Sequence, residues 1–190
     1  MKKIIIGIVG LLFLLAGCGQ KKESAESSTS TITEAFQPNL PVLENANNNT
    51  VVTKTLVLPA DENGIQQTQT ITYKGKQFLT LTIQQKRQVS EDLKNFITER
   101  GLEEARSALK EEESKDESLQ SARKIAGFTI ETTLLNEKEM ETKTSYDFQT
   151  LDLKKASENE YLKNVGLENL LKNEPEDYIA NRVANGATVQ

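Results

Sequence analysis

The stretch that decides the architecture of this chain is residues 66–83, which read QQTQTITYKGKQFLTLTI. Apolar side chains alternate with Thr and Gln on both sides of Lys74-Gly75-Lys76, where Gly75 permits the positive φ of a tight turn. The alternating positions are Ile71 and Tyr73 before the turn, and Leu79, Leu81 and Ile83 after it. This period of two predicts an antiparallel hairpin with one buried face and one solvated face.

The residues before the hairpin predict a further strand. From Thr50 onward, Val52, Leu56 and Leu58 alternate along the chain until Pro59, which ends the strand. Asp61-Glu62-Asn63-Gly64 is then a turn signal. We therefore expect three consecutive antiparallel strands that share a polar outer face.

Helical patterns follow the third strand. Ser90 is suited to cap a helix, and Glu91 and Asp92 in its first turn complement the helix dipole. Gly101 separates two apolar stripes and predicts a break or kink there. The charge run Lys110–Glu117 is interpreted as a solvated helical end, because no EF-hand loop or comparable liganding pattern is present.

A second hairpin and further helices complete the chain. Period two returns over residues 127–135, and after the turn at 136–138 the apolar side chains fall on even positions: Met140, Tyr146 and Phe148. Helical spacing resumes from Asp152, and Pro175 opens a last helix that Asn185-Gly186 ends. We predict a single α+β domain over 50–190, with an antiparallel sheet of about five strands (a three-stranded meander, a helix and a hairpin) and helices on one face.

The first 18 residues predict export and lipidation. Lys2 and Lys3 precede the uncharged apolar run Ile4–Gly17, which is the layout of a secretory signal and is shorter than a spanning helix. Leu15-Ala16-Gly17-Cys18 resembles the lipobox of bacterial lipoproteins. That resemblance implies cleavage between Gly17 and Cys18 and a palmitate-type diacylglyceryl group on Cys18, whose two acyl chains suffice for stable anchoring. We expect a lipid-anchored protein on the outer side of the cell membrane, on the extracellular face of a Gram-positive cell.

Residues 18–49 are predicted to be the lipidated cysteine and a flexible tether, because they are rich in Ser, Thr and Asn. The apolar side chains at Phe36, Leu40, Val42 and Leu43 are the exception. Two interpretations stay open for them, an extended strap that docks on the domain and a short recognition segment. The signal octapeptide 10–17 resembles the apolar mating pheromones released from some lipoprotein signals, although any Leu-rich signal ending in Ala-Gly has that appearance.

Composition excludes several chemistries. Cleavage removes Lys2 and Lys3 and leaves 21 basic against 28 acidic side chains, a net charge of −7 that disfavours nucleic acid. The chain has no His, and its single Cys is the predicted lipid carrier. Ser-His-Asp and Cys-His catalysis, imidazole-ligated zinc and disulfides in the mature domain are therefore excluded. We expect no cofactor, no metal and no catalytic residue.

Several segments together resemble the YehR-like lipoproteins, small bacterial lipoproteins of uncharacterised function. They are Thr72-Tyr73-Lys74-Gly75-Lys76, the Thr-rich strand and charged helix after it, and Phe128–Leu153 followed by Lys154-Lys155. The similarity covers Val51–Ser157 and implies an α+β domain with an antiparallel sheet. The long tether and the helices after Ser157 depart from the pattern, and no catalytic residue carries over.

These observations favour a binding or interaction module of the cell envelope, whose ligand is an envelope protein, a peptide or a small apolar molecule. Tyr73, Phe78 and Tyr146 are the candidate ligand-binding side chains, as aromatic members of one sheet face or groove. Two alternatives stay open, an envelope enzyme using carboxylates alone, such as a glycan hydrolase, and a structural spacer. Two buried carboxylates about 5–10 Å apart would favour the enzyme.

Overall fold

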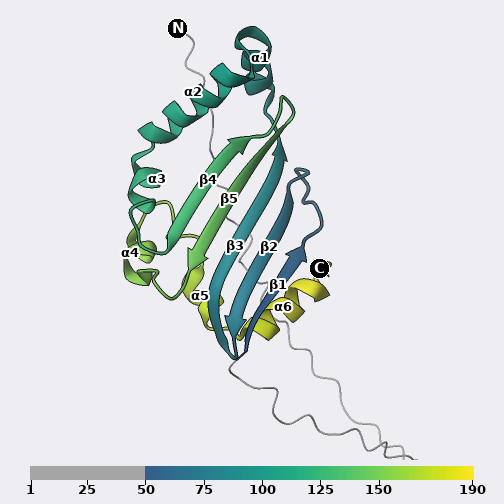
Figure 1. Ribbon diagram of the computed structural model, residues 1–190, viewed down its shortest axis with the longest axis vertical. Coiled ribbons are helices and arrows are strands. Elements are labelled where there is room, and N and C mark those ends of the chain that lie inside the picture. The colour runs from purple at the N-terminus through teal and green to yellow at the C-terminus, as the bar shows by residue number, and fades with distance from the viewer. Residues whose placement is uncertain (1–49) are drawn as a thin grey trace, which may run out of the picture.

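The structure is a computed structural model that describes residues 50–190 (Figure 1). The predictions for the signal, Cys18, the tether and the octapeptide 10–17 concern residues outside this described part. Within it, the helices and strands form the α+β fold that the sequence predicts.

All strands form one antiparallel sheet, in the order β4-β5-β3-β2-β1-β6. Their bounds are β1 Val51–Val57, β2 Gln66–Lys74, β3 Gln77–Gln88, β4 Phe128–Leu134, β5 Glu139–Asp147 and β6 Thr188–Val189. The sixth strand exceeds the expected number of about five. It is only two residues long and exists because the C-terminal end of the chain returns to β1, where the Gln190 N–H donates to the Thr55 carbonyl at 2.9 Å.

A β-bulge changes which residues of β3 face the core. The register shifts by one residue opposite Thr72 and Tyr73, so that Phe78, and not Leu79, lies on the same face as Leu81. The expectation that Leu79 lines the buried face is therefore wrong. An extra residue in one strand of an antiparallel pair reverses the alternation on one side of the bulge.

The helices are α1 Glu91–Arg100, α2 Leu102–Lys115, α3 Glu117–Ala122, α4 Leu153–Glu158, α5 Leu167–Leu171 and α6 Pro175–Ala184. The predicted cap of α1 is confirmed, since the Leu93 N–H donates to the Ser90 hydroxyl at 3.4 Å. The break at Gly101 is also confirmed, with φ of 88° between α1 and α2.

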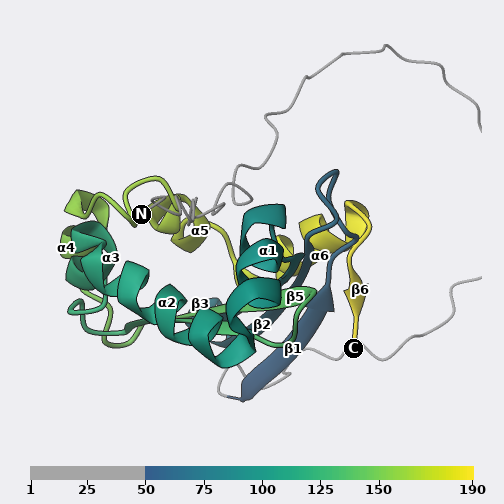
Figure 2. The same ribbon diagram turned by 90° about the horizontal axis from the view of Figure 1, so that it is seen from above.

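The charge run over residues 110–117 is not one solvated helical end. Asp116 stops α2 and caps α3, because its carboxylate accepts the Leu119 N–H at 3.0 Å. The tight turn between the two helices also brings Arg123 back to Glu113, whose side chain is buried. A separate contact places α3 beside α4, where the Asn159 amide donates to the Ser121 hydroxyl at 2.7 Å (Figure 2).

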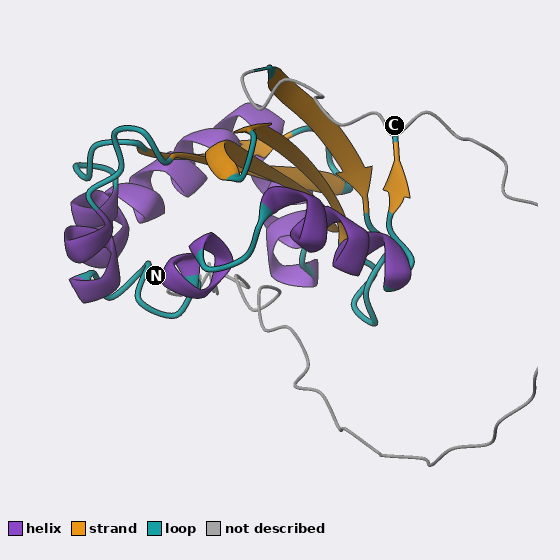
Figure 3. Cartoon of the chain, turned by 90° about the horizontal axis from the view of Figure 1, so that it is seen from below, coloured by secondary structure: helices purple, strands orange, loops and turns teal. Residues whose placement is uncertain are grey.

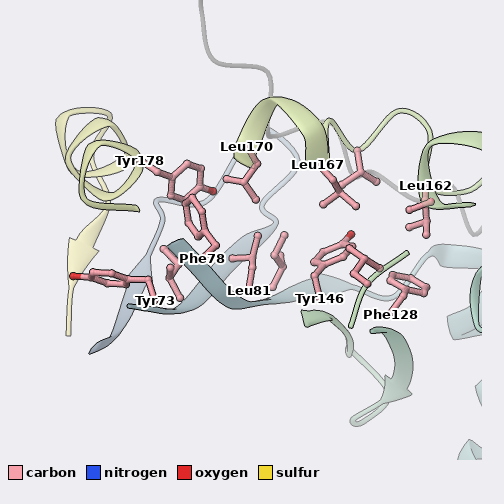
Figure 4. Close-up of a cluster of buried hydrophobic side chains, with 14 of the residues drawn as sticks. Tyr73, Phe78, Leu81, Phe128, Tyr146, Leu162, Leu167, Leu170 and Tyr178 are labelled. Carbon is pink, nitrogen blue, oxygen red and sulfur yellow. The ribbon is translucent and has the colours of Figure 1, made fainter. Parts of the chain in front are cut away.

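The helices gather on one side of the sheet, while α2 runs along its β4 edge (Figures 1 and 3). One apolar cluster joins the sheet to α4, α5 and α6, and contains residues from beyond Ser157: Leu162, Leu167, Leu170 and Tyr178 (Figure 4). A second cluster joins α1 and α2 to the ends of β3, β4 and β5. The opposite face of the sheet carries paired hydroxyls, such as Thr82 with Ser145 at 2.9 Å.

Candidate functional site

The three aromatic side chains that the sequence nominates lie in the core, under the helices (Figure 4). The Tyr73 hydroxyl donates to the Glu176 carboxylate of α6. The Phe78 ring meets the Tyr178 ring edge to face at 5.9 Å between centroids. Ligand binding by these side chains stays a prediction, and the described conformation covers them.

Tyr146 is the most enclosed of the three, with 0% of its surface exposed. Its ring rises from β5 toward Leu167, and its hydroxyl has no hydrogen-bond partner within the described part of the chain (Figure 4). Burial raises the pKa of this phenol well above its usual value. The side chain therefore packs as a hydrophobic group that carries an unsatisfied polar atom.

An open groove lies elsewhere, between α2 and the edge strand β4. Its volume is about 410 Å³, which is within the range of ligand pockets. One wall of the groove is a single face of α2, because its lining residues lie about one helical turn apart or next to each other. They are Arg106, Leu109, Lys110 and Glu113. The opposite wall is residues 130–134 of β4, and Arg123 lies at the α3 end. We call this the α2–β4 groove.

The backbone of β4 is partly open toward the groove. The odd-numbered residues of β4 are the ones whose backbone N–H and C=O groups bond to β5. The same parity holds at the end of the hairpin, where the Asp147 N–H donates to the Gly127 carbonyl at 2.7 Å. Even-numbered residues therefore direct their N–H and C=O groups at α2. Arg106 Nε donates to the Leu134 carbonyl at 3.0 Å. Between Leu134 and Ile130, the outward N–H and C=O of Thr132 form no hydrogen bond with any described residue.

A buried ion pair closes the α3 end of the groove. Arg123 Nη2 lies 2.7 Å from Glu113 Oε2 and 3.5 Å from the Ile130 carbonyl. Glu113 is only 7% exposed, and its other oxygen, Oε1, has no partner among the described residues. The pair orients the Arg123 guanidinium toward the strand edge, and leaves one buried carboxylate oxygen without a hydrogen-bond donor among the described residues.

Tyr161 lies close enough to the ion pair for the charges of Glu113 and Arg123 to act on its phenol, and its ring centroid is 6.5 Å from that of Phe128. Burial is the main reason that the pKa of Tyr161 is raised, and the nearby Asp116 and Glu113 carboxylates add to the effect. The Leu119 N–H holds the pKa of Asp116 below its usual value by donating to that carboxylate. The raised pKa keeps the Tyr161 phenol neutral, so it adds no charge beside the ion pair.

The groove thus offers backbone donors and acceptors beside charged side chains. Within residues 50–190, no group of three or more acidic, His or Cys side chains is placed to hold a metal ion. No helix of this part is long and apolar enough to cross a membrane. The sequence interpretation missed Glu113, because the charge run Lys110–Glu117 was interpreted as solvated, and it assigned no role to Arg106 and Arg123. The available signal was that Arg106 and Glu113 lie at helical spacing on either side of Leu109.

Fold and groove together define a class, an α+β domain whose antiparallel sheet keeps one strand edge accessible beside a helix. The chain belongs to the YehR-like family, since a family model matches residues 51–182. The match extends past Ser157, where the sequence resemblance ended, and so adds α5 and most of α6.

Two solved structures are similar to the chain. A Streptococcus pneumoniae TIGR4 protein solved by NMR is 61% identical, with 87% of this chain and 100% of that chain covered and a TM-score of 0.69. The Escherichia coli YehR protein, also solved by NMR, is 18% identical, with 74% of this chain and 91% of that chain covered and a TM-score of 0.48. No protein with a curated description matches the chain.

Proposed function

We propose that this protein is a lipid-anchored binding module of the cell envelope that holds an extended peptide segment in the α2–β4 groove. The observation that carries the proposal is the outward backbone of Thr132, which faces a groove of about 410 Å³ and bonds to no described residue. An edge strand with accessible N–H and C=O groups can accept a further strand from a partner. Such a peptide would extend the sheet beyond β4.

The walls of the groove suit an extended backbone. The helix α2 supplies an apolar floor through Leu109, with Lys110 and Glu113 available to polar groups of the ligand. Arg106 covers the carbonyls of Leu134 and Leu135, which restricts strand addition to a short length centred on Thr132. A short register-limited contact gives modest affinity, and this suits a reversible interaction rather than a permanent assembly.

The anchor supports an envelope role. The proposed lipid on Cys18 would hold the domain at the outer side of the cell membrane, and a coil of the length of 19–49 averages about 30 Å end to end. A net charge of −7 disfavours flat contact with anionic lipid. The absence of His, and of any Cys other than Cys18, favours binding over catalysis.

The test is a selection of phage-displayed random heptapeptides on the mature chain without its lipid, residues 19–190. Enriched peptides should shift the backbone amide NMR signals of residues 130–134. Thr132→Pro removes the outward N–H without touching the ladder to β5, so the variant should fold and lose these peptides. Thr129→Val serves as the control, because it changes a side chain of the same strand and leaves the groove intact. Peptides that bind Thr132→Pro as well as the parent would overturn the proposal.

A further inference from the structure

The β4 edge that faces the α2–β4 groove offers more hydrogen-bond donors than acceptors. The outward N–H groups of Ile130, Thr132 and Leu134 form no hydrogen bond with a described residue. By contrast, the Ile130 carbonyl accepts from Arg123 Nη2 at 3.5 Å, and the Leu134 carbonyl accepts from Arg106 Nε at 3.0 Å. Each guanidinium thus covers an acceptor of the edge and leaves the donor of the same residue open.

The charged side chains of the groove add to this positive character. Arg106, Lys110 and Arg123 line the groove, together with the carboxylates of Glu113 and Glu131. Arg123 neutralises the Glu113 carboxylate at 2.7 Å. Glu131 is an odd-numbered residue of β4, so its exposed side chain lies on the face of the sheet away from the helices. The groove is therefore cationic, although the whole chain has a net charge of −5.

Lys110 is the groove cation that lacks a partner. The other basic side chains of α2 are paired, since Arg106 forms an ion pair with Glu103, and Lys115 lies 2.8 Å from Glu111. The Lys110 ammonium forms no ion pair or hydrogen bond with residues 50–190. It lies one helical turn from Arg106, and like charges at this spacing repel each other. A solvated lysine is the ordinary explanation of an exposed ammonium, but α2 places this unpaired one in the groove.

Two contacts align α2 with β4. Near the start of α2, Arg106 bonds to the Leu134 carbonyl. Near its end, Glu113 is joined to the Ile130 carbonyl through Arg123. Between these contacts the helix rises about 10 Å and the strand about 13 Å, so the two elements run antiparallel over a similar length.

This alignment brings Lys110 to the level of Thr132, in the middle of the open edge. Even-numbered residues of β4 face the helices, as the buried Phe128 and Leu134 do. Residues that are directly opposite in an antiparallel pair project their side chains to the same face. An added strand whose central residue pairs with Thr132 therefore directs the side chain of that residue toward α2, where the Lys110 ammonium lies.

We propose that the α2–β4 groove selects acidic peptides, in which an Asp or Glu side chain opposite Thr132 pairs with Lys110. This inference rests on the proposed peptide binding and specifies its ligand. A carboxylate supplies the acceptors and the negative charge that the groove lacks. A basic side chain at the same position would meet Lys110 and Arg106 with like charge and be rejected.

The test repeats the heptapeptide selection on three forms of residues 19–190, the parent, Lys110→Gln and Lys110→Glu. Peptides selected on the parent should be enriched in Asp and Glu and depleted of Lys and Arg relative to the unselected library. Lys110→Gln should lose this enrichment, and Lys110→Glu should select basic peptides. Lys154→Gln is the matched control, because it removes the same charge from an exposed helical position that does not line the groove.

The affinity of an enriched acidic peptide should fall about two- to five-fold in Lys110→Gln, the ratio for a solvent-exposed ion pair, and stay unchanged in Lys154→Gln. High salt should remove the difference between the parent and Lys110→Gln. Peptides that Thr132→Pro loses but that show no acidic enrichment, or that Lys110→Gln binds equally well, would overturn the acidic preference and leave the peptide site standing. Peptides that bind Thr132→Pro as well as the parent would overturn the site and the preference together.

Discussion

Two tyrosine-to-phenylalanine changes should have opposite effects on stability, because one buried hydroxyl is paired and the other is not. Tyr146 is fully buried, and its hydroxyl has no partner among the described residues. Tyr178 is also buried, and its hydroxyl donates to Gln69 Oε1 at 2.8 Å. Both substitutions delete a single oxygen atom and preserve the ring, so neither creates a large cavity.

The magnitudes follow from the cost of unsatisfied polar groups. An unpartnered buried hydroxyl costs about 1–3 kcal/mol, so Tyr146→Phe should raise the free energy of unfolding by about 1 kcal/mol or more. Tyr178→Phe removes the donor to Gln69, a residue with no exposed surface, and should lower the free energy of unfolding by about 1–3 kcal/mol. The free energies of unfolding of the two variants should thus differ by at least about 2 kcal/mol, and Tyr146→Phe should be the more stable variant.

Urea denaturation of residues 19–190, followed by circular dichroism, measures both changes, and the slope with urea should stay constant. A thermal scan should separate the variants by several degrees, since about 1 kcal/mol corresponds to roughly 2–4 °C in a domain of this size. A Tyr146→Phe variant that is destabilised by more than about 1 kcal/mol would refute the reasoning, because the hydroxyl would then have a favourable partner.

Three further predictions concern the turn before β4, an alkaline transition and the anchor. Gly127→Ala should destabilise the domain by about 3 kcal/mol or more, since the new Cβ would lie 2.6 Å from the Asp147 carbonyl oxygen. Gly64→Ala is the control, because its Cβ would meet open space and only the positive φ should cost about 1–2 kcal/mol. Urea melts measure both changes. Burial and a neighbouring carboxylate raise the pKa of Tyr73 to about 12. The neutral phenol therefore contributes its full stability below the unfolded pKa of about 10, and this contribution is lost as the pH rises toward 12. When the free energy of unfolding is measured against pH, Tyr73→Phe should show a smaller alkaline loss of stability. Cys18→Ala should abolish palmitate incorporation and release the domain from membranes in fractionation, and equal labelling of the variant would contradict the proposed anchor.

Local rules were sufficient for much of the fold. Alternation placed the first three strands and the second hairpin, and Ser90, Gly101 and Pro175 marked helix boundaries that the structure confirms. These signals succeed because capping and alternation depend on near neighbours in the chain. They failed at Leu79, where a bulge in the pairing with β2 changes the face, and at β6, whose two residues carry no pattern of their own.

The candidate sites depended on contacts between distant residues. Glu113 belongs to the charge run that was interpreted as solvated, and Arg106 precedes that run. Only the position of α2 beside the edge of β4 gives these two residues a groove to line. Nothing local indicates that the Thr132 backbone is open to that groove. Its availability follows from which strand ends the sheet and from the parity of its pairing with β5.

The sequence by itself determined the α+β class, the order of strands and helices, and the exclusion of histidine and thiol chemistry in residues 50–190, because these follow from composition and short-range periodicity. It also carries the complete predicted anchor in residues 1–18. Only the tertiary structure decided that Gln67, Gln85, Thr142 and Thr132 form one row, since their adjacency is set by strand register over long sequence separations. The physical reason is that periodicity tells which side of a strand a residue takes, whereas burial and pairing depend on which strands and helices become its neighbours.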